Sequence, residues 1–166
     1  TNMVYNGFVR FWKEPLRNTL LPLLDAYKAG LEVGDFEFAG IACYSYTYQS
    51  FYCGTELGSV ASEMNSYDKV LDSLNQSGRL PYHKIYYQMV ENFRGNTENP
   101  AVFKGDMYDP EIGLPIHLER NDRTAIFILN FCKGILAYNF DEIESSLDAL
   151  NTGMKELDFI VGSWAK

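Results

Sequence analysis

Apolar residues recur along most of this chain with the period of an α-helix, and this period limits the possible folds more than any other feature. One apolar stripe consists of Leu20, Leu23, Leu24, Tyr27 and Leu31. That spacing is expected for one face of a helix with about 3.6 residues per turn. Comparable stripes cover 57–74, 82–93 and 143–157. No stretch sustains the strict alternation of a strand, so the sequence predicts an all-α fold.

Two further segments, 36–53 and 122–138, are apolar nearly all round. A helix of this kind is buried on more than one side, so each segment is expected at the centre of a helical stack. The chain has 166 residues, of which 46% are hydrophobic, and this suits one folded domain over 1–166. Because the sequence starts in mid-pattern at Thr1, we expect a segment of a larger protein.

The net charge limits the partners that the chain is expected to bind, and the cysteines indicate its cellular compartment. The net charge is −8 and no Lys/Arg cluster is present, so nucleic acids and anionic membrane surfaces are not expected partners. The most apolar stretch, 124–138, is interrupted by Asn130 and Lys133, and no membrane insertion is predicted. Three cysteines, an odd number, favour a reduced, cytoplasmic protein without a disulfide.

The helical pattern fails between about residues 95 and 121. This region carries Pro100, Gly105, Pro110, Gly113 and Pro115. It also contains many apolar residues, too many for a free linker. The sequence therefore predicts a long ordered loop near 95–121 that lies against the helices.

Two short motifs resemble the turn between paired helices. In the first, Gly34 is expected to end one helix in a left-handed conformation and Asp35 to cap the next. Phe36 is expected to wedge between the two helices, and the small Ala39 to allow their contact. Phe140 marks a second such turn, 104 residues after Phe36, close to three periods of a repeat of about 34 residues. The sequence thus predicts antiparallel helical hairpins stacked as a degenerate tetratricopeptide-like superhelix.

Three stretches carry a more specific resemblance, which covers residues 8–160. They are the Trp12-Lys13-Glu14-Pro15 start, Gly34-Asp35-Phe36-Glu37, and Asn121-Asp122-Arg123-Thr124. They resemble the helical region of large bacterial signalling hybrids, which join a serine/threonine kinase and a predicted ATPase to GAF sensor modules and often to a histidine kinase. The resemblance implies a non-catalytic scaffold that contacts proteins or neighbouring domains of the same chain.

A search for chemistry gives one weak candidate. No phosphate-binding glycine loop, His-Glu-x-x-His, Cys-x-x-Cys or Gly-x-Ser-x-Gly motif occurs, so no catalytic, metal or cofactor residue is predicted. The alternative is a small metal-dependent hydrolase built on a group of acidic residues and one histidine. Its members are Asp106, Asp109, Glu111, His117, Glu119 and Asp122. Acids ahead of a helix usually serve as caps, and Asn121 or Asp122 is expected to cap the following helix.

Tyrosines are concentrated in 36–53 and allow two interpretations. Aromatic residues there alternate with small ones, which suits a central packing helix with Tyr46 largely buried. The alternative is a small-molecule sensor with a pocket lined by Tyr44, Tyr46, Tyr48 and Tyr52. A scaffold that joins or regulates signalling modules is the leading hypothesis.

Overall fold

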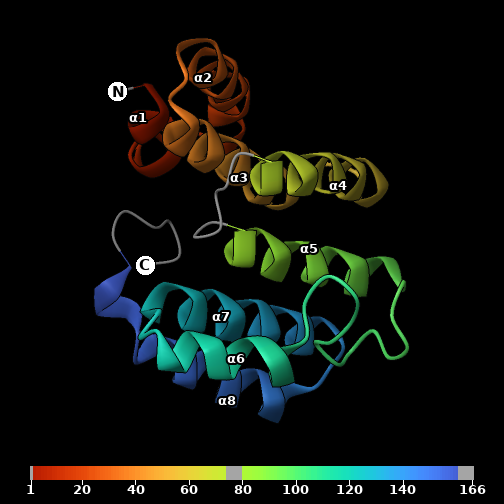
Figure 1. Cartoon of the computed structure of the whole chain (residues 1–166). Coiled ribbons are helices and arrows are strands. Elements are labelled where there is room, and N and C mark those ends of the chain that lie inside the picture. Colours follow the sequence, from red (N-terminus) through yellow and green to blue (C-terminus); the bar gives the residue numbers. More distant parts are fainter. Residues whose placement is uncertain (1, 74–79, 161–166) are drawn as a thin grey trace. The chain divides into compact units, whose positions relative to one another are not determined.

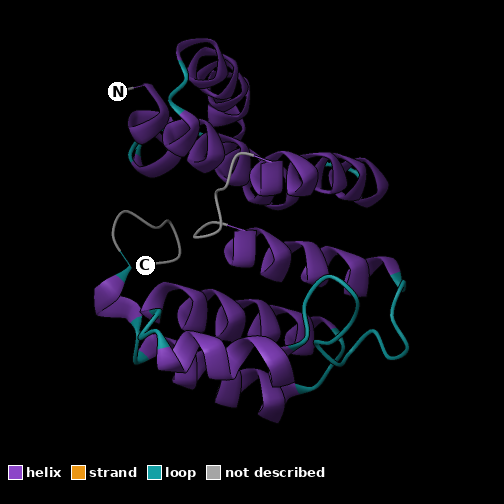
Figure 2. Cartoon of the chain, viewed as in Figure 1, coloured by secondary structure: helices purple, strands orange, loops and turns teal. Residues whose placement is uncertain are grey.

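The computed structural model describes residues 2–73 and 80–160 of the chain. Within these ranges the protein contains only helices and no strand, as the periodicity predicted (Figures 1 and 2). The helices are α1 (Asn2–Phe8), η1 (Arg10–Trp12), η2 (Leu16–Thr19), α2 (Leu20–Val33), α3 (Phe36–Tyr52), α4 (Leu57–Ser73), α5 (Leu80–Arg94), α6 (Pro110–Glu119), α7 (Arg123–Asn139), α8 (Ile143–Met154) and η3 (Leu157–Phe159). Leu74, which belongs to the second predicted stripe, lies outside the described residues.

The described residues fall into two compact units. The first comprises 2–73 and 80–83, and the second comprises 84–160. In both units, helices that follow one another in sequence pack as antiparallel pairs. The single domain over 1–166 stays a prediction.

Helix α3 is the centre of the first unit, because it contacts α1, α2 and α4. Ten of its residues are buried, which agrees with its apolar character on all sides. The hydrophobic core that it shares with α1 and α2 consists of Met3, Leu23, Ile41 and Ala42. Partly buried side chains of Phe8, Ala26, Tyr27 and Tyr46 close this core.

The turn between α2 and α3 brings the two helices close together. Gly34 ends α2 with φ 75°, and the side chain of Asp35 accepts a hydrogen bond from the amide of Phe38 at 3.3 Å. A Cβ atom at Gly30 would lie only 3.0 Å from that of Ala39, so these small residues bring the two backbones into contact. Phe36 does not wedge between the helices and is 44% exposed. The contact at Gly30 leaves no gap for its ring.

The pair formed by α7 and α8 repeats this close approach in the second unit. Asp141, with φ 62°, makes the turn, and the preceding Phe140 is the C-cap of α7. The Phe140 ring is stacked on that of Phe93 in α5, with 6.3 Å between centroids. A Cβ atom at Gly134 would meet Cγ of Leu150 at 2.6 Å. Residues that face α7 from α8 are small, namely Ser146, Ala149 and Gly153.

Helix α6 corrects the prediction of a single loop from 95 to 121. The loop ends at Asp109, whose side chain accepts a hydrogen bond from the amide of Glu111 at 2.8 Å and caps α6. Pro110 is tolerated because the first residue of a helix needs no amide donor. Pro115 lies inside the helix, where it removes one backbone hydrogen bond, to the carbonyl of Glu111. Treating every proline as a helix breaker therefore hides this helix.

We expect Gly134→Ala to destabilise the second unit although alanine favours a helix over glycine. The new methyl group collides with Leu150, and such overpacking costs about 1–3 kcal/mol, more than the helix-propensity gain of about 0.5–1 kcal/mol. The matched control is Gly7→Ala in α1, where the nearest atoms would be 3.6 Å from the new Cβ. Chemical denaturation measures both variants. Equal midpoints for the two would contradict the close approach of α7 and α8.

Candidate functional site

Two buried amides of α5 hold the loop 95–109 in place. Gln88 accepts hydrogen bonds through Oε1 from the amides of Met107 and Tyr108, each at 3.1 Å. Asn92 donates from Nδ2 to the carbonyls of Pro100 at 3.0 Å and Val102 at 2.7 Å. The two side chains are joined by a 2.8 Å hydrogen bond from Gln88 Nε2 to Asn92 Oδ1. The loop is thus ordered against a helix, as its apolar content predicted.

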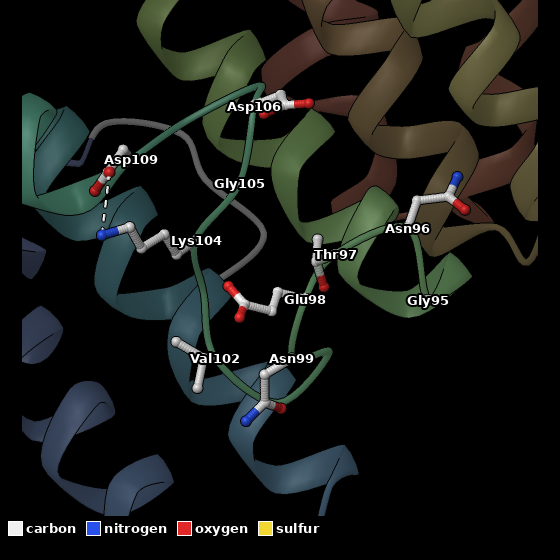
Figure 3. Close-up of a pocket in the computed structure, with 10 residues that line it drawn as sticks. All are labelled: Gly95, Asn96, Thr97, Glu98, Asn99, Val102, Lys104, Gly105, Asp106 and Asp109. Carbon is white, nitrogen blue, oxygen red and sulfur yellow. Dashed lines mark ion pairs between the residues drawn. The ribbon is translucent and has the colours of Figure 1, made fainter.

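This loop encloses an open hollow of about 800 Å3 (Figure 3). Thr97 and Glu98 lie on one stretch of the loop, and Lys104 and Gly105 on the facing one. The ammonium group of Lys104 is 3.4 Å from a carboxylate oxygen of Asp109, and 2.6 Å from one of Glu111. Carboxylates therefore already hold this cation, and their hydrogen bonds raise the pKa of Lys104. The hollow has no buried charged group that would select a ligand.

His117 lies beneath the loop in a small aromatic cluster. Its ring is stacked on Tyr108 with 6.1 Å between centroids, and its Nδ1 is 3.5 Å from Oδ2 of Asp122. Burial lowers the pKa of His117, although Asp122 opposes the shift. Burial also raises the pKa of Tyr108 to about 12. Since His117 Nε2 and the Tyr108 hydroxyl are both buried from solvent, neither group reaches a substrate in this structure.

The acidic residues of 106–122 do not converge on one point. Asp109 caps α6, and Asp122 caps α7 by accepting a hydrogen bond from the amide of Ala125 at 3.0 Å. Glu119 is exposed at the end of α6, and Asp106 borders the hollow of the loop. Among residues 2–73 and 80–160, no group of three or more His, Cys, Asp or Glu side chains is placed to hold a metal ion.

The four tyrosines considered for a ligand pocket are divided among separate ring contacts. Tyr44 packs against Tyr48 with 5.1 Å between centroids, and Tyr48 is buried. Tyr52 packs edge-on against Phe51 at 5.0 Å. Tyr46 is on the α4 side of α3 and is only partly buried, not largely buried as predicted. A helix with aromatic residues on every side sends neighbouring tyrosines in different directions.

The cysteines have no activated thiol. All three are free, and burial raises the pKa of Cys43 to about 12 and that of Cys132 well above its ordinary value. Cys53, at the end of α3, is partly exposed, and burial raises its pKa too. A thiolate is the reactive form of cysteine, so these thiols are poor nucleophiles near neutral pH.

The most regular apolar stripe of the sequence is exposed. On α8, Ile143 is 48%, Leu147 57% and Met154 63% exposed, while Leu150 lies partly buried over Gly134. Sequence periodicity found this stripe but not its direction. The small residues Ser146, Ala149 and Gly153 take the place next to α7, so the large side chains remain outside that contact. Such a face is suited to binding a protein.

Two features escaped the sequence analysis. The first is the outward direction of the α8 stripe. Small residues lie one position before stripe residues in the sequence, and they indicate the side of the helix that packs closely. The second is the pair of loop anchors, Gln88 and Asn92. Two amides four residues apart in a helix lie on one face, and here they fall among apolar residues, so they indicate a buried polar contact.

None of the helices within 2–73 and 80–160 combines the length and apolar character needed to cross a bilayer. No protein-family model, curated protein or solved structure matches this chain.

We expect Asn92→Leu to release the loop 95–109. The change leaves two loop carbonyls and the Gln88 amide without their partner, and each such buried group costs about 1–3 kcal/mol. Hydrogen exchange should then accelerate at the amides of Met107 and Tyr108, and the urea midpoint should fall. The control is Asn96→Ala, because the exposed Asn96 side chain donates its hydrogen bond to Glu91 of α5 and not to a loop carbonyl. Unchanged exchange in Asn92→Leu would show that the amides do not anchor the loop.

We expect Tyr46→Ala to cost about 2 kcal/mol of unfolding free energy, less than the 3–5 kcal/mol or so of a fully buried ring. Tyr46 packs edge-on against Tyr67 at 6.1 Å, and its hydroxyl donates to Glu63 at 2.9 Å. Tyr46→Phe removes only that hydrogen bond and should cost at most about 1 kcal/mol. Denaturant midpoints compare the two. Wild-type stability in the alanine variant would mean that the ring does not pack on α4.

Proposed function

We propose that this chain is a non-catalytic helical scaffold that mediates protein–protein or inter-domain contacts in a signal-transduction protein. The observation that carries the proposal is the exposed apolar stripe of α8, on a helix that is itself packed closely against α7. Exposed large apolar side chains on a rigid helix are typical of protein-binding surfaces. The first unit contributes further exposed apolar residues on α2, namely Leu21, Leu31 and Val33.

The sequential antiparallel hairpins support a more specific proposal, a degenerate tetratricopeptide-like superhelix. Small residues at Gly30 and Ala39 in one unit, and at Gly134 and Gly153 in the other, give both hairpins the same close packing. Repeat proteins of this kind bind partners along helix faces. With the resemblance to bacterial signalling hybrids, this favours a scaffold beside kinase and ATPase domains in a cytoplasmic protein.

Photo-crosslinking tests the protein-contact part of the proposal. A photoreactive phenylalanine analogue replaces Leu147 or Leu21, both exposed and apolar, in the protein expressed in its source cells. The matched control carries the same group at Ser145, an exposed polar position of α8. We expect discrete adducts, to a second polypeptide or to another part of the same one, at the apolar positions alone. The same adducts at all three positions, or none at any, would contradict the proposal.

A thermal-shift screen tests the alternative, a small-molecule sensor among the tyrosines of α3. Ligand at 100 times its Kd adds about 2.7 kcal/mol to stability, which a rise in Tm readily shows. We expect no saturable rise with metabolites or divalent cations. A rise that Tyr48→Phe removes, at a position whose hydroxyl contacts Gln49, would favour the sensor.

A further inference from the structure

We propose that His117 is a pH-sensitive latch for the loop 95–109, which stays closed while the imidazole ring is neutral and opens when the ring takes up a proton. The closed state is the one in the structure, and in the open state the loop has left α6. The groups involved all belong to the second unit, in the loop, in α6 and at the start of α7. This inference goes beyond the proposed scaffold and does not rest on it.

Tyr108 covers His117 in the closed state. The two rings are within 11° of parallel, and their centroids are 6.1 Å apart. Gly113, one turn before His117 on α6, makes room for the tyrosine, because a Cβ atom there would lie 2.3 Å from the hydroxyl oxygen. Tyr108 is 8% exposed and His117 only 4%. Opening the loop would remove Tyr108 and admit water to the histidine ring.

The proton that charges His117 has to be added at Nε2. Nδ1 lies 3.5 Å from the carboxylate oxygen Oδ2 of Asp122, so the neutral ring carries its hydrogen on Nδ1. Nε2 is then the bare nitrogen, and it is buried without a hydrogen-bond partner among the described residues. A proton at this atom would create a buried, charged N–H group without an acceptor, which is unfavourable.

The charged groups that act on His117 oppose one another. Asp122 at the start of α7 favours the charged ring, and Arg120 at the end of α6 favours the neutral one. Tyr108 of the loop is uncharged near neutral pH, because burial raises its pKa to about 12. The charged side chains at the junction of the loop and α6 pair with one another, namely Lys104, Asp109 and Glu111. Burial of the ring outweighs Asp122 and lowers the pKa of His117.

The latch follows from the different proton affinities of the two states. In the open state, where water reaches the ring, the pKa of His117 returns to its ordinary value of about 6.5. Above this pH the neutral ring contributes fully to closure. As the pH falls from about 6.5 through the lowered pKa, the open state binds the proton more tightly, so the closed state loses stability. Ordinary carboxylates titrate near pH 4, and residues 84–160 contain no other histidine.

Hydrogen exchange at the amides of Met107 and Tyr108 tests the latch, because both amides are bonded to Gln88 in the closed state. Dividing the intrinsic exchange rate at each pH by the measured rate gives a protection factor. We expect both factors to fall several-fold between pH 7.5 and pH 5.0, and to stay below that of the Leu129 amide in α7. Unchanged factors overturn the proposal. Factors equal to that of Leu129 also overturn it, because acid would then unfold the whole unit.

His117→Phe removes the titrating group and keeps an aromatic ring beside Tyr108. We expect the protection factors of the two loop amides in this variant to be the same at pH 7.5 and pH 5.0. A fall as large as that of the wild type would assign the effect of acid to another group and overturn the latch.

Titration of the His117 ring by nuclear magnetic resonance tests the role of Tyr108 and does not depend on the folding of His117→Phe. We expect the pKa of His117 to be lowered in the wild type and to rise toward its ordinary value in Tyr108→Ala, which removes the cover. The control is Tyr108→Phe, which keeps the ring and should titrate like the wild type. Nitrogen chemical shifts should place the hydrogen of the neutral ring on Nδ1. Equal pKa values in the wild type and Tyr108→Ala, or a hydrogen on Nε2, overturn the proposal.

Discussion

Close contact between consecutive helices at small residues is the constraint on which the rest of the structure depends. Gly30 meets Ala39 in one unit, and Gly134 lies beneath Leu150 in the other. A side chain larger than these would separate the backbones and remove the contacts that give each pair its packing. Because the small residues occupy the direct line between two helices, the large apolar side chains are placed to either side of it.

That displacement accounts for the exposed face of α8. In an amphipathic helix on a globular core, the stripe of largest apolar residues normally faces inward. Here the inward positions of α8 are Ser146, Ala149 and Gly153, and the hydroxyl of Ser146 donates to the carbonyl of Gly134 at 2.9 Å. The apolar stripe lies about a quarter turn away along the helix surface. The residues that hold the hairpin together therefore also fix where its exposed apolar stripe points.

The fold class could be predicted from the sequence, and its finer features could not, for identifiable reasons. Periodicity located α2, α3, α4, α5, α7 and α8, since each has an apolar stripe or is apolar all round. It missed α6, where Pro110 and Pro115 mask a helix that Asp109 starts by capping. It also missed α1, whose seven residues make too short a pattern to recognise.

The candidate sites were less predictable, because they depend on contacts between residues far apart in sequence. Asp122 is expected to cap α7 because it directly precedes that helix, so this prediction needs only the local sequence. No local rule shows that Gln88 receives the amides of Met107 and Tyr108 nearly twenty residues later. The same limit applied to Tyr46, whose partial burial follows from where Tyr67 and Glu63 of α4 come to lie.

The polar groups of the second unit and the exposed stripe of α8 differ in how far their contacts are made within the chain. Gln88 and Asn92 use their hydrogen-bonding groups to fix a loop, and Asp109 and Asp122 use theirs to start helices. These polar groups therefore have their hydrogen-bond partners within the chain. The apolar groups of α8 are the opposite case, since their contacts with the rest of the chain are incomplete. If the proposed scaffold buries them against a partner, it would gain about 25 cal/mol for each Å2 of apolar surface removed from water.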